Sequence, residues 1–154
     1  MSKRLSVLKY PQAMKPLMDF SAAVHASGLE RPLVELILLR VSQINGCAYC
    51  IDMHSKDARA AGETEQRLYL LQAWREAPFY SERECAALGW TEAVTRLGEH
   101  GVSDEVYDRA RTSFSEEELV TLTVVIGMIN TWNRINVAFQ TPAGNYKPAA
   151  KQAA

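Results

Sequence analysis

Two cysteines and one histidine form the most reactive group of side chains in the sequence. Cys47 and Cys50 are separated by two residues, and His54 lies four residues after Cys50. On a helix these positions share one stripe, because residues three or four apart lie on the same face. The imidazole of His54 can then take the proton of the Cys50 thiol, and the thiolate is the reactive form of cysteine. The spacing therefore predicts a redox-active thiol pair beside a base.

The residues before the pair place it at the start of a helix. Asn45 and Gly46 form a strong turn signal, so we expect a helix to begin near Cys47. The first turn of a helix has unpaired amides and the positive end of the helix dipole, and both stabilise a thiolate. A Cys-x-x-Cys motif in this position has a thiol pKa well below the free value of about 8.5.

Glu35 is the candidate third member of the group. The segment 32–44 is apolar on nearly all sides, which predicts a buried helix around this carboxylate. A buried carboxylate is costly unless it is hydrogen-bonded, and it can serve in proton transfer at neutral pH. The short turn at residues 45–46 predicts that this helix neighbours the one with His54, so the two side chains can meet. A structural ion pair between Glu35 and Arg40 is the alternative.

A Cys-x-x-Cys motif is also found in zinc sites and in ordinary packed helices. A structural zinc site needs four ligands, and outside this helix only Cys85, His25 and His100 remain, without a second pair at ligand spacing. We therefore expect no bound metal. A thioredoxin-like fold is also excluded, because no βαβ pattern surrounds the motif. Cys85 is expected to pack as a small hydrophobic residue, and Trp132 to Arg134 to serve in core or subunit packing.

Composition narrows the class of protein. The chain has 154 residues, of which 47% are hydrophobic and 23% are charged, a balance typical of one globular domain. The formal net charge is -1 and no basic run is present, so nucleic acid is not an expected partner. The longest apolar stretch, 119–129, is shorter than the roughly 20 residues of a membrane span. Without a signal-peptide pattern, and with an odd number of cysteines, we expect a reducing, cytoplasmic setting.

The turn residues along the sequence divide it into a series of helices, and no long run of alternating apolar and polar residues indicates a sheet. The sequence therefore predicts an all-α fold. Serine and glutamate at capping-box spacing mark two further helix starts, at Ser81 and Ser115. We expect one helical domain over residues 1–140 and a loosely ordered tail over 141–154. The other predicted helices cover residues 12–26, 32–44, about 47 to 61, and 65–73.

A set of residues extends from before the cysteine motif to well after it: Glu35, Arg40-Val41-Ser42-Gln43, Asn45-Gly46-Cys47-Ala48-Tyr49-Cys50, His54, Ala58, Gly62 and Trp74-Arg75. In these residues the sequence resembles the carboxymuconolactone decarboxylase superfamily and, within it, the AhpD-like alkylhydroperoxidase branch. The resemblance extends past Trp90 to Trp132-Asn133-Arg134, so only the two ends of the chain are uncovered.

This resemblance implies an all-helical homo-oligomer, a trimer or hexamer, that reduces organic hydroperoxides or hydrogen peroxide. It implies that Cys50 is the exposed reactive cysteine, that Cys47 is its disulfide partner, and that His54 and Glu35 form a proton relay. An external dithiol or protein reductant would restore the dithiol, and no metal, flavin or nicotinamide cofactor is required. AhpD has a histidine where this sequence has Tyr49, so the relay would lack one basic group.

Two other functions remain open at this point. The protein could be a decarboxylase-like lyase in which the cysteines are incidental, although the decarboxylase branch lacks the cysteine pair. It could also be a non-enzymatic redox sensor whose disulfide changes its oligomeric state. Alkylation of the thiols would leave a lyase active, and only a sensor requires a change of assembly on oxidation.

Overall fold

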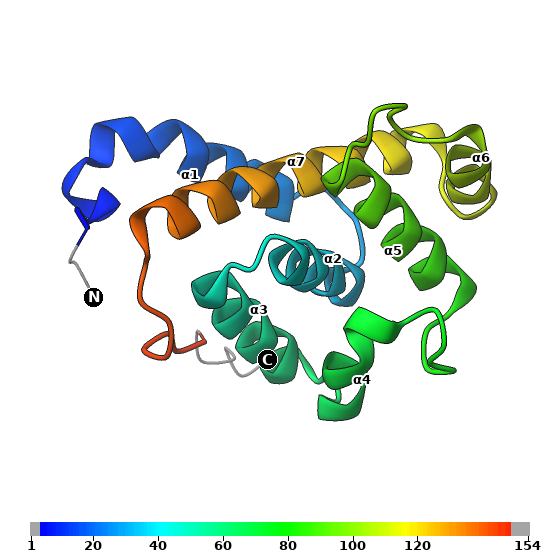
Figure 1. Cartoon of the computed structure of the whole chain (residues 1–154), viewed down its shortest axis with the longest axis horizontal. Coiled ribbons are helices and arrows are strands. Elements are labelled where there is room, and N and C mark those ends of the chain that lie inside the picture. Colours follow the sequence, from blue (N-terminus) through cyan, green and yellow to red (C-terminus); the bar gives the residue numbers. More distant parts are fainter. Residues whose placement is uncertain (1–3, 149–154) are drawn as a thin grey trace.

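Helix α2 (Arg31–Ile44) lies at the centre of the fold, and three other helices pack around it (Figure 1). The structure is a computed structural model that describes residues 4–148. Every residue from Leu33 to Ser42 is buried, which explains why this segment is apolar on nearly all sides. The helices packed against α2 are α3 (Ala48–Ala61), α5 (Glu82–Thr95) and α7 (Glu116–Phe139).

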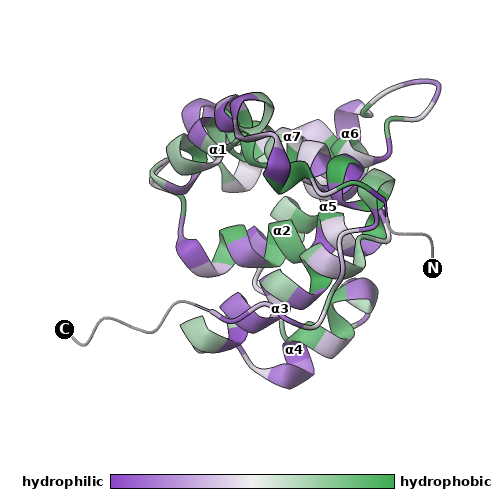
Figure 2. Cartoon of the chain, turned by 90° about the vertical axis from the view of Figure 1, so that its left-hand side faces the viewer, coloured by the Kyte–Doolittle hydropathy of each residue, from purple (hydrophilic) through white to green (hydrophobic). Residues whose placement is uncertain are grey.

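The remaining helices complete two layers around α2. Helix α1 (Pro11–His25) runs antiparallel to α7, and this pair lies on the side of α2 opposite to α3 and α4, as Figure 2 shows from a second direction. Helix α6 (Asp104–Ser113) packs against α5 and α7. Helix α4 (Glu65–Leu70) continues into a 3-10 turn (Leu71–Ala73), and another 3-10 turn (Val7–Lys9) precedes α1. Within residues 4–148 no helix is long and apolar enough to cross a membrane.

The hydrophobic core has two parts that meet at α2. Residues on one side of α2, such as Ile37 and Val41, pack against α5 and α7. Leu36 and Leu39 face the other part, which α3, α4 and α5 complete with Ala58, Leu68, Leu71, Trp74 and Leu88. Because α2 supplies side chains to both parts, its residues are held from all directions. The position of Glu35 on α2 is therefore fixed by the core.

The predicted all-α fold is confirmed for the described residues, whose only β-type pairing is an isolated bridge. The helices predicted over 12–26, 32–44 and 47–61 correspond to α1, α2 and α3 within one or two residues. Both capping boxes are present, at Ser81 and Ser115. Helix α6 was not predicted, because its residues are mostly polar and only Ala110 among them is buried.

The segment after α7 is hydrogen-bonded to α3, which the sequence did not indicate. The backbone N–H of Gly144 donates to Asp52 at 3.0 Å, and the ammonium of Lys56 donates to the carbonyl of Tyr146 at 3.1 Å. Residues 141–148 form no helix or strand, and residues 149–154 of the predicted tail lie outside the described residues. The division of the chain at residue 140 stays a prediction.

Two glycines provide a test of how α3 ends. Gly62 follows α3 with φ of +106°, a left-handed conformation that costs other residues about 1 kcal/mol or more. Gly127 lies inside α7, and at neither glycine would an added Cβ meet another atom within 4 Å. We expect Gly62→Ala to lower the free energy of unfolding by about 1 kcal/mol and Gly127→Ala to raise it by about 0.5 kcal/mol. Urea denaturation measures both, and equal effects would contradict the conformational explanation.

Candidate active site

The cysteine pair occupies the first turn of α3. Cys47 is the N-cap residue, and its sulfur accepts a hydrogen bond from the backbone N–H of Cys50 at 3.3 Å. The thiol thus fills the place that serine or threonine commonly takes at a helix start. The two cysteines form a disulfide, with 5.3 Å between their Cα atoms. Both sulfurs lie where unpaired amides and the helix dipole favour negative charge.

Cys50 is buried in the fold and lines a partly open cavity. Cys47 and Cys50 are each only 1% exposed, so the exposed position that the resemblance implies for Cys50 is not observed. Cys50 instead lines a cavity of about 230 Å³ between α1, α3 and α7, and Cys47 does not. The burial has a simple cause, because α7 packs against α3. A small molecule in the cavity would lie against Cys50.

His54 contacts Glu35 on one side and the cavity on the other. Both residues are 5% exposed, and the Nδ1 atom of His54 is 3.4 Å from Oε2 of Glu35. The Nε2 atom is buried and has no hydrogen-bond partner within residues 4–148. A carboxylate at Nδ1 favours the tautomer with hydrogen on that nitrogen, which leaves the lone pair of Nε2 free to accept a proton. His54 also lines the cavity beside Cys50.

The alternative pairing of Glu35 with Arg40 is not observed. Arg40 binds Glu92 of α5 instead, with 2.6 Å between its Nη2 atom and Oε1 of the carboxylate. Burial would raise the pKa of Glu92, but hydrogen bonds from Trp74, Arg75 and Arg40 outweigh it and hold that pKa below its usual value. Glu92 thus neutralises the buried guanidinium of Arg40, and Glu35 contacts His54 instead.

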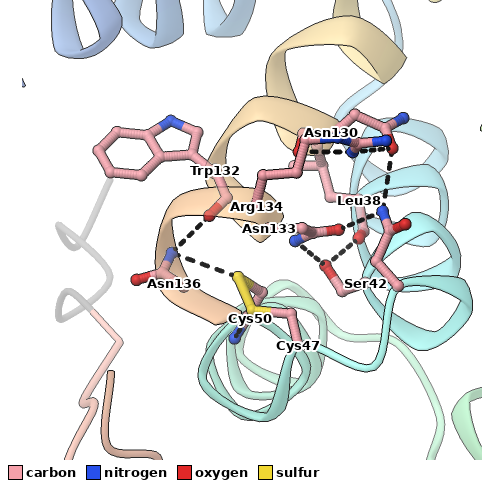
Figure 3. The surroundings of a disulfide bond; sticks show 10 residues. Leu38, Ser42, Cys47, Cys50, Asn130, Trp132, Asn133, Arg134 and Asn136 are labelled. Atoms are coloured by element: carbon pink, nitrogen blue, oxygen red, sulfur yellow. Dashed lines mark hydrogen bonds between the residues drawn. A yellow bond between two sulfur atoms is a disulfide. The ribbon is translucent and has the colours of Figure 1, made fainter. Parts of the chain in front are cut away.

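Asn136 is a site residue that the sequence analysis missed. Its side-chain amide donates to the sulfur of Cys50 at 3.5 Å and to the carbonyl of Trp132 at 3.0 Å, as Figure 3 shows. An N–H donor at this distance stabilises negative charge on sulfur, so Asn136 favours the thiolate in the reduced protein. Asn136 follows Cys50 by 86 residues in the sequence, and local spacing cannot reveal such a contact.

Asn136 is the last of three asparagines spaced three residues apart along α7. The amide of Asn45 donates to the side-chain oxygens of Asn130 and Asn133 at 2.9 Å each. Asn133 in turn donates to the hydroxyl of Ser42 at 3.1 Å (Figure 3). These bonds hold the turn between α2 and α3, and with it the start of α3, against α7. A polar residue at every third position of an apolar helix is the signal that could have indicated this row.

Asp57 is a second missed residue, close to the pair of His54 and Glu35. One acid or imidazole atom from each of the three side chains lies within 4.8 Å of the others. Asp57 is seven residues after Cys50, so it shares the helix stripe with both Cys50 and His54. The three could in principle ligate a cation, but the hydroxyl of Tyr146 already donates to both oxygens of Asp57 at 2.9 Å.

Other residues singled out in the sequence divide into two groups. His25, Tyr49 and Trp132 line the cavity, and Trp132 also donates from its indole N–H to Ser21 at 2.7 Å. Trp132 thus joins α7 to α1 at the cavity wall, beyond the packing role predicted for it. Cys85 is half-buried away from the site, and burial raises the pKa of its thiol.

Comparison with known proteins supports the resemblance. The model of the carboxymuconolactone decarboxylase family matches residues 11–93, which include Glu35, both cysteines and His54. The chain belongs to this family. The match ends before α6 and α7, so it does not include Asn136 or Tyr146.

Two known proteins are similar in sequence to nearly the whole of this chain. The uncharacterised protein YdfG of Bacillus subtilis is 47% identical over 94% of this chain and 99% of its own length. The structure of ATU0492 from Agrobacterium tumefaciens, a protein of unknown function suggested to be the antioxidant defence protein AhpD, is 45% identical with a TM-score of 0.90. It covers 94% of this chain and 100% of its own. The chain is thus AhpD-like.

A third known protein is similar to this chain in fold, at lower sequence identity. The debrominase Bmp8, solved as a cysteine-to-alanine variant in complex with 2,3,4-tribromopyrrole, is 22% identical with a TM-score of 0.80. The alignment covers 89% of this chain and 73% of the Bmp8 chain. The helical arrangement alone therefore does not identify the reaction. The function has to be inferred from the residues of the site.

The contact between Asn136 and Cys50 can be tested in the reduced protein. We expect Asn136→Ala to raise the pH of half-maximal alkylation of Cys50 by about half a unit to one unit, because the thiolate loses a hydrogen-bond donor. Iodoacetamide labelling at a series of pH values, with mass spectrometry of the Cys50 peptide, measures it. Thr131→Ala is the control, since Thr131 is exposed on the same helix and bonds only to Gly127. An unchanged midpoint in Asn136→Ala would show that the amide does not act on the sulfur.

Proposed function

We propose that the protein is a thiol peroxidase that reduces organic hydroperoxides, or hydrogen peroxide, through its Cys47–Cys50 pair. The observation that carries the proposal is the shared cavity, which Cys50 and His54 both line. The unpartnered Nε2 atom of this imidazole is the base that thiol chemistry requires. The similarity to ATU0492 supports the same function.

The first step oxidises Cys50. His54 accepts the thiol proton of Cys50 at Nε2, and the thiolate attacks the outer oxygen of the hydroperoxide. The O–O bond breaks, and the alkoxide that leaves takes a proton from the imidazolium. The products are an alcohol and the sulfenic acid of Cys50. Glu35 stabilises the imidazolium through Nδ1 while the proton is held there.

The second step forms the disulfide. The thiol of Cys47 loses its proton and its sulfur attacks the sulfenic sulfur of Cys50. The S–O bond breaks, and the hydroxyl takes up that proton and leaves as water. The two Cα atoms are already close enough for this bond, as the disulfide of the structure demonstrates. An external dithiol or a reductant protein then supplies two electrons and two protons to regenerate both thiols.

The shape of the cavity favours a small organic hydroperoxide. Its volume of about 230 Å³ is modest, and Met53, Met128, Ile129 and Trp132 give it a largely apolar wall. Apolar surface gains free energy when it leaves water, so an alkyl or aryl group would add affinity that hydrogen peroxide lacks.

The assignment of the nucleophile is tested in a single turnover. Prereduced Cys50→Ser should consume a hydroperoxide no faster than the uncatalysed background, because the attacking sulfur is absent. Cys47→Ser should consume one equivalent and stop at the sulfenic acid, which dimedone captures. Cys85→Ser is the matched control and should behave as the wild type, since Cys85 lies outside the site. Equal rates in Cys50→Ser and the wild type would show that another group reacts.

The role of His54 as the base is tested by the pH dependence of hydroperoxide consumption. We expect His54→Ala to slow hydroperoxide consumption about a hundredfold at pH 7. The loss should shrink above pH 9, because a thiol with the free pKa of about 8.5 then ionises without help. Glu35→Gln should show a smaller loss with the same pH trend, since it keeps a hydrogen-bond acceptor near Nδ1. A loss that is constant with pH would assign His54 a structural role.

The two other functions give different results. A lyase reaction would survive alkylation of Cys47 and Cys50, whereas peroxidase turnover would stop. A redox sensor would change its oligomeric state on oxidation, which gel filtration of the oxidised and reduced forms measures. The predicted homo-oligomer, trimer or hexamer, is determined by the same measurement.

A further inference from the structure

The segment after α7 reaches the site through one side chain. The hydroxyl of Tyr146 donates to both carboxylate oxygens of Asp57 at 2.9 Å. Two further bonds fix the segment on α3, from Gly144 to Asp52 and from Lys56 to the carbonyl of Tyr146. The partly buried Tyr146 thus caps the carboxylate of Asp57. It is held in place because the bonds to Gly144 and to its own carbonyl fix the surrounding backbone on α3.

Asp57 is placed to act on His54. Its carboxylate belongs to the trio with His54 and Glu35, whose acid and imidazole atoms lie within 4.8 Å of one another. Opposite charges at this distance attract, so a carboxylate on Asp57 would interact favourably with an imidazolium on His54. The imidazolium is the form that His54 takes once it has accepted the thiol proton of Cys50. A fixed charge on Asp57 would thus help the transfer of that proton.

Tyr146 can donate its hydrogen bond throughout the range of pH in which thiols ionise. Burial, together with the hydrogen bond to Asp57, raises the pKa of Tyr146 to about 12. The phenol is therefore neutral at every pH where the peroxidase reaction would run. Its hydrogen bond keeps the two oxygens of Asp57 in one orientation and prevents them from turning towards solvent.

We propose that Tyr146 is a positioning residue for the site: it holds Asp57 beside His54, where the carboxylate can stabilise the imidazolium that forms when His54 takes the thiol proton of Cys50. The inference rests on the proposed function, in which His54 takes the thiol proton. It assigns a role in the chemistry to residues after 140, a part of the chain that the family model does not match.

The charged groups that face this site come from several elements. Glu35 of α2 contacts His54 directly, and Asp57 belongs to the same helix as His54. His25 of α1 lines the cavity, as does Tyr49 of α3.

On the far side of Glu35, Glu63 and Arg67 line a shallow depression with it. Arg67 forms ion pairs with Glu63 at 2.9 Å and with Glu84 at 2.5 Å, so these three groups are engaged with one another and not with His54. The cavity residues of α7, among them Asn136 and Trp132, carry no charge. Asp57 is therefore the carboxylate in this set whose position Tyr146 controls.

The test is the pH dependence of Cys50 alkylation in reduced full-length protein with Cys47→Ser and Cys85→Ser. We expect Tyr146→Phe to raise the pH of half-maximal alkylation and to slow alkylation at pH 7 about three- to tenfold. Asp57→Asn should give a shift at least as large, and adding Tyr146→Phe to it should change nothing further, because both act through one carboxylate.

Tyr69→Phe is the matched control. Tyr69 also donates to a carboxylate, that of Glu65 at 3.1 Å, but it lies on the exposed face of α4. This variant should leave the pH profile unchanged. Asp57→Glu, which keeps the charge, should restore part of the rate lost in Asp57→Asn.

The result that would overturn the proposal is a pH profile in Tyr146→Phe equal to that of the parent, whatever its thermal stability. An additive effect of Tyr146→Phe on Asp57→Asn would also overturn it. Failure of the proposed function looks different: reduced wild-type protein would consume no hydroperoxide, while the alkylation profiles would still report on Tyr146.

Discussion

The structure depends on one buried contact, between Glu35 and His54. A carboxylate inside a helix that is buried on nearly all sides needs a polar partner, and the imidazole of α3 provides it. The contact fixes α3 against α2 and also fixes the direction of the imidazole ring. Since Nδ1 is engaged, Nε2 is the atom left without a partner. The requirement to satisfy a buried charge thus orients the group that the proposed chemistry uses.

The remaining parts of the site are held by weaker polar contacts from α7. The row of asparagines bonds to the end of α2, to the turn after it and to the sulfur of Cys50. These contacts place the first turn of α3 under α7 and leave each of the two cysteines only 1% exposed. The same helix supplies part of the apolar wall of the cavity. Burial of the disulfide and formation of the cavity therefore have a common cause.

Local signals in the sequence were sufficient for the helices and for part of the site. Capping boxes, the glycine after α3 and the stripe that contains Cys50 and His54 act over a few residues, and the structure contains each of them. The contact between Glu35 and His54 followed from the short turn between two helices. Asn136 and Tyr146 approach α3 from positions more than 80 residues away in the chain, and no local pattern encodes such distances. Asp57 lies on the same stripe of α3, but the sequence analysis did not consider it, because a single carboxylate at helical spacing does not by itself indicate a site.

In the proposed reaction, the different surroundings of the two sulfurs would determine which sulfur an external reductant attacks. Only Cys50 lines the cavity, whereas Cys47 is covered and caps the helix. An incoming thiolate must attack the sulfur it can reach, so the mixed disulfide forms through Cys50 and Cys47 departs as the leaving group. The helix start stabilises the departing thiolate. A chamber of about 230 Å³ also admits a slender dithiol more readily than the surface of a globular electron donor.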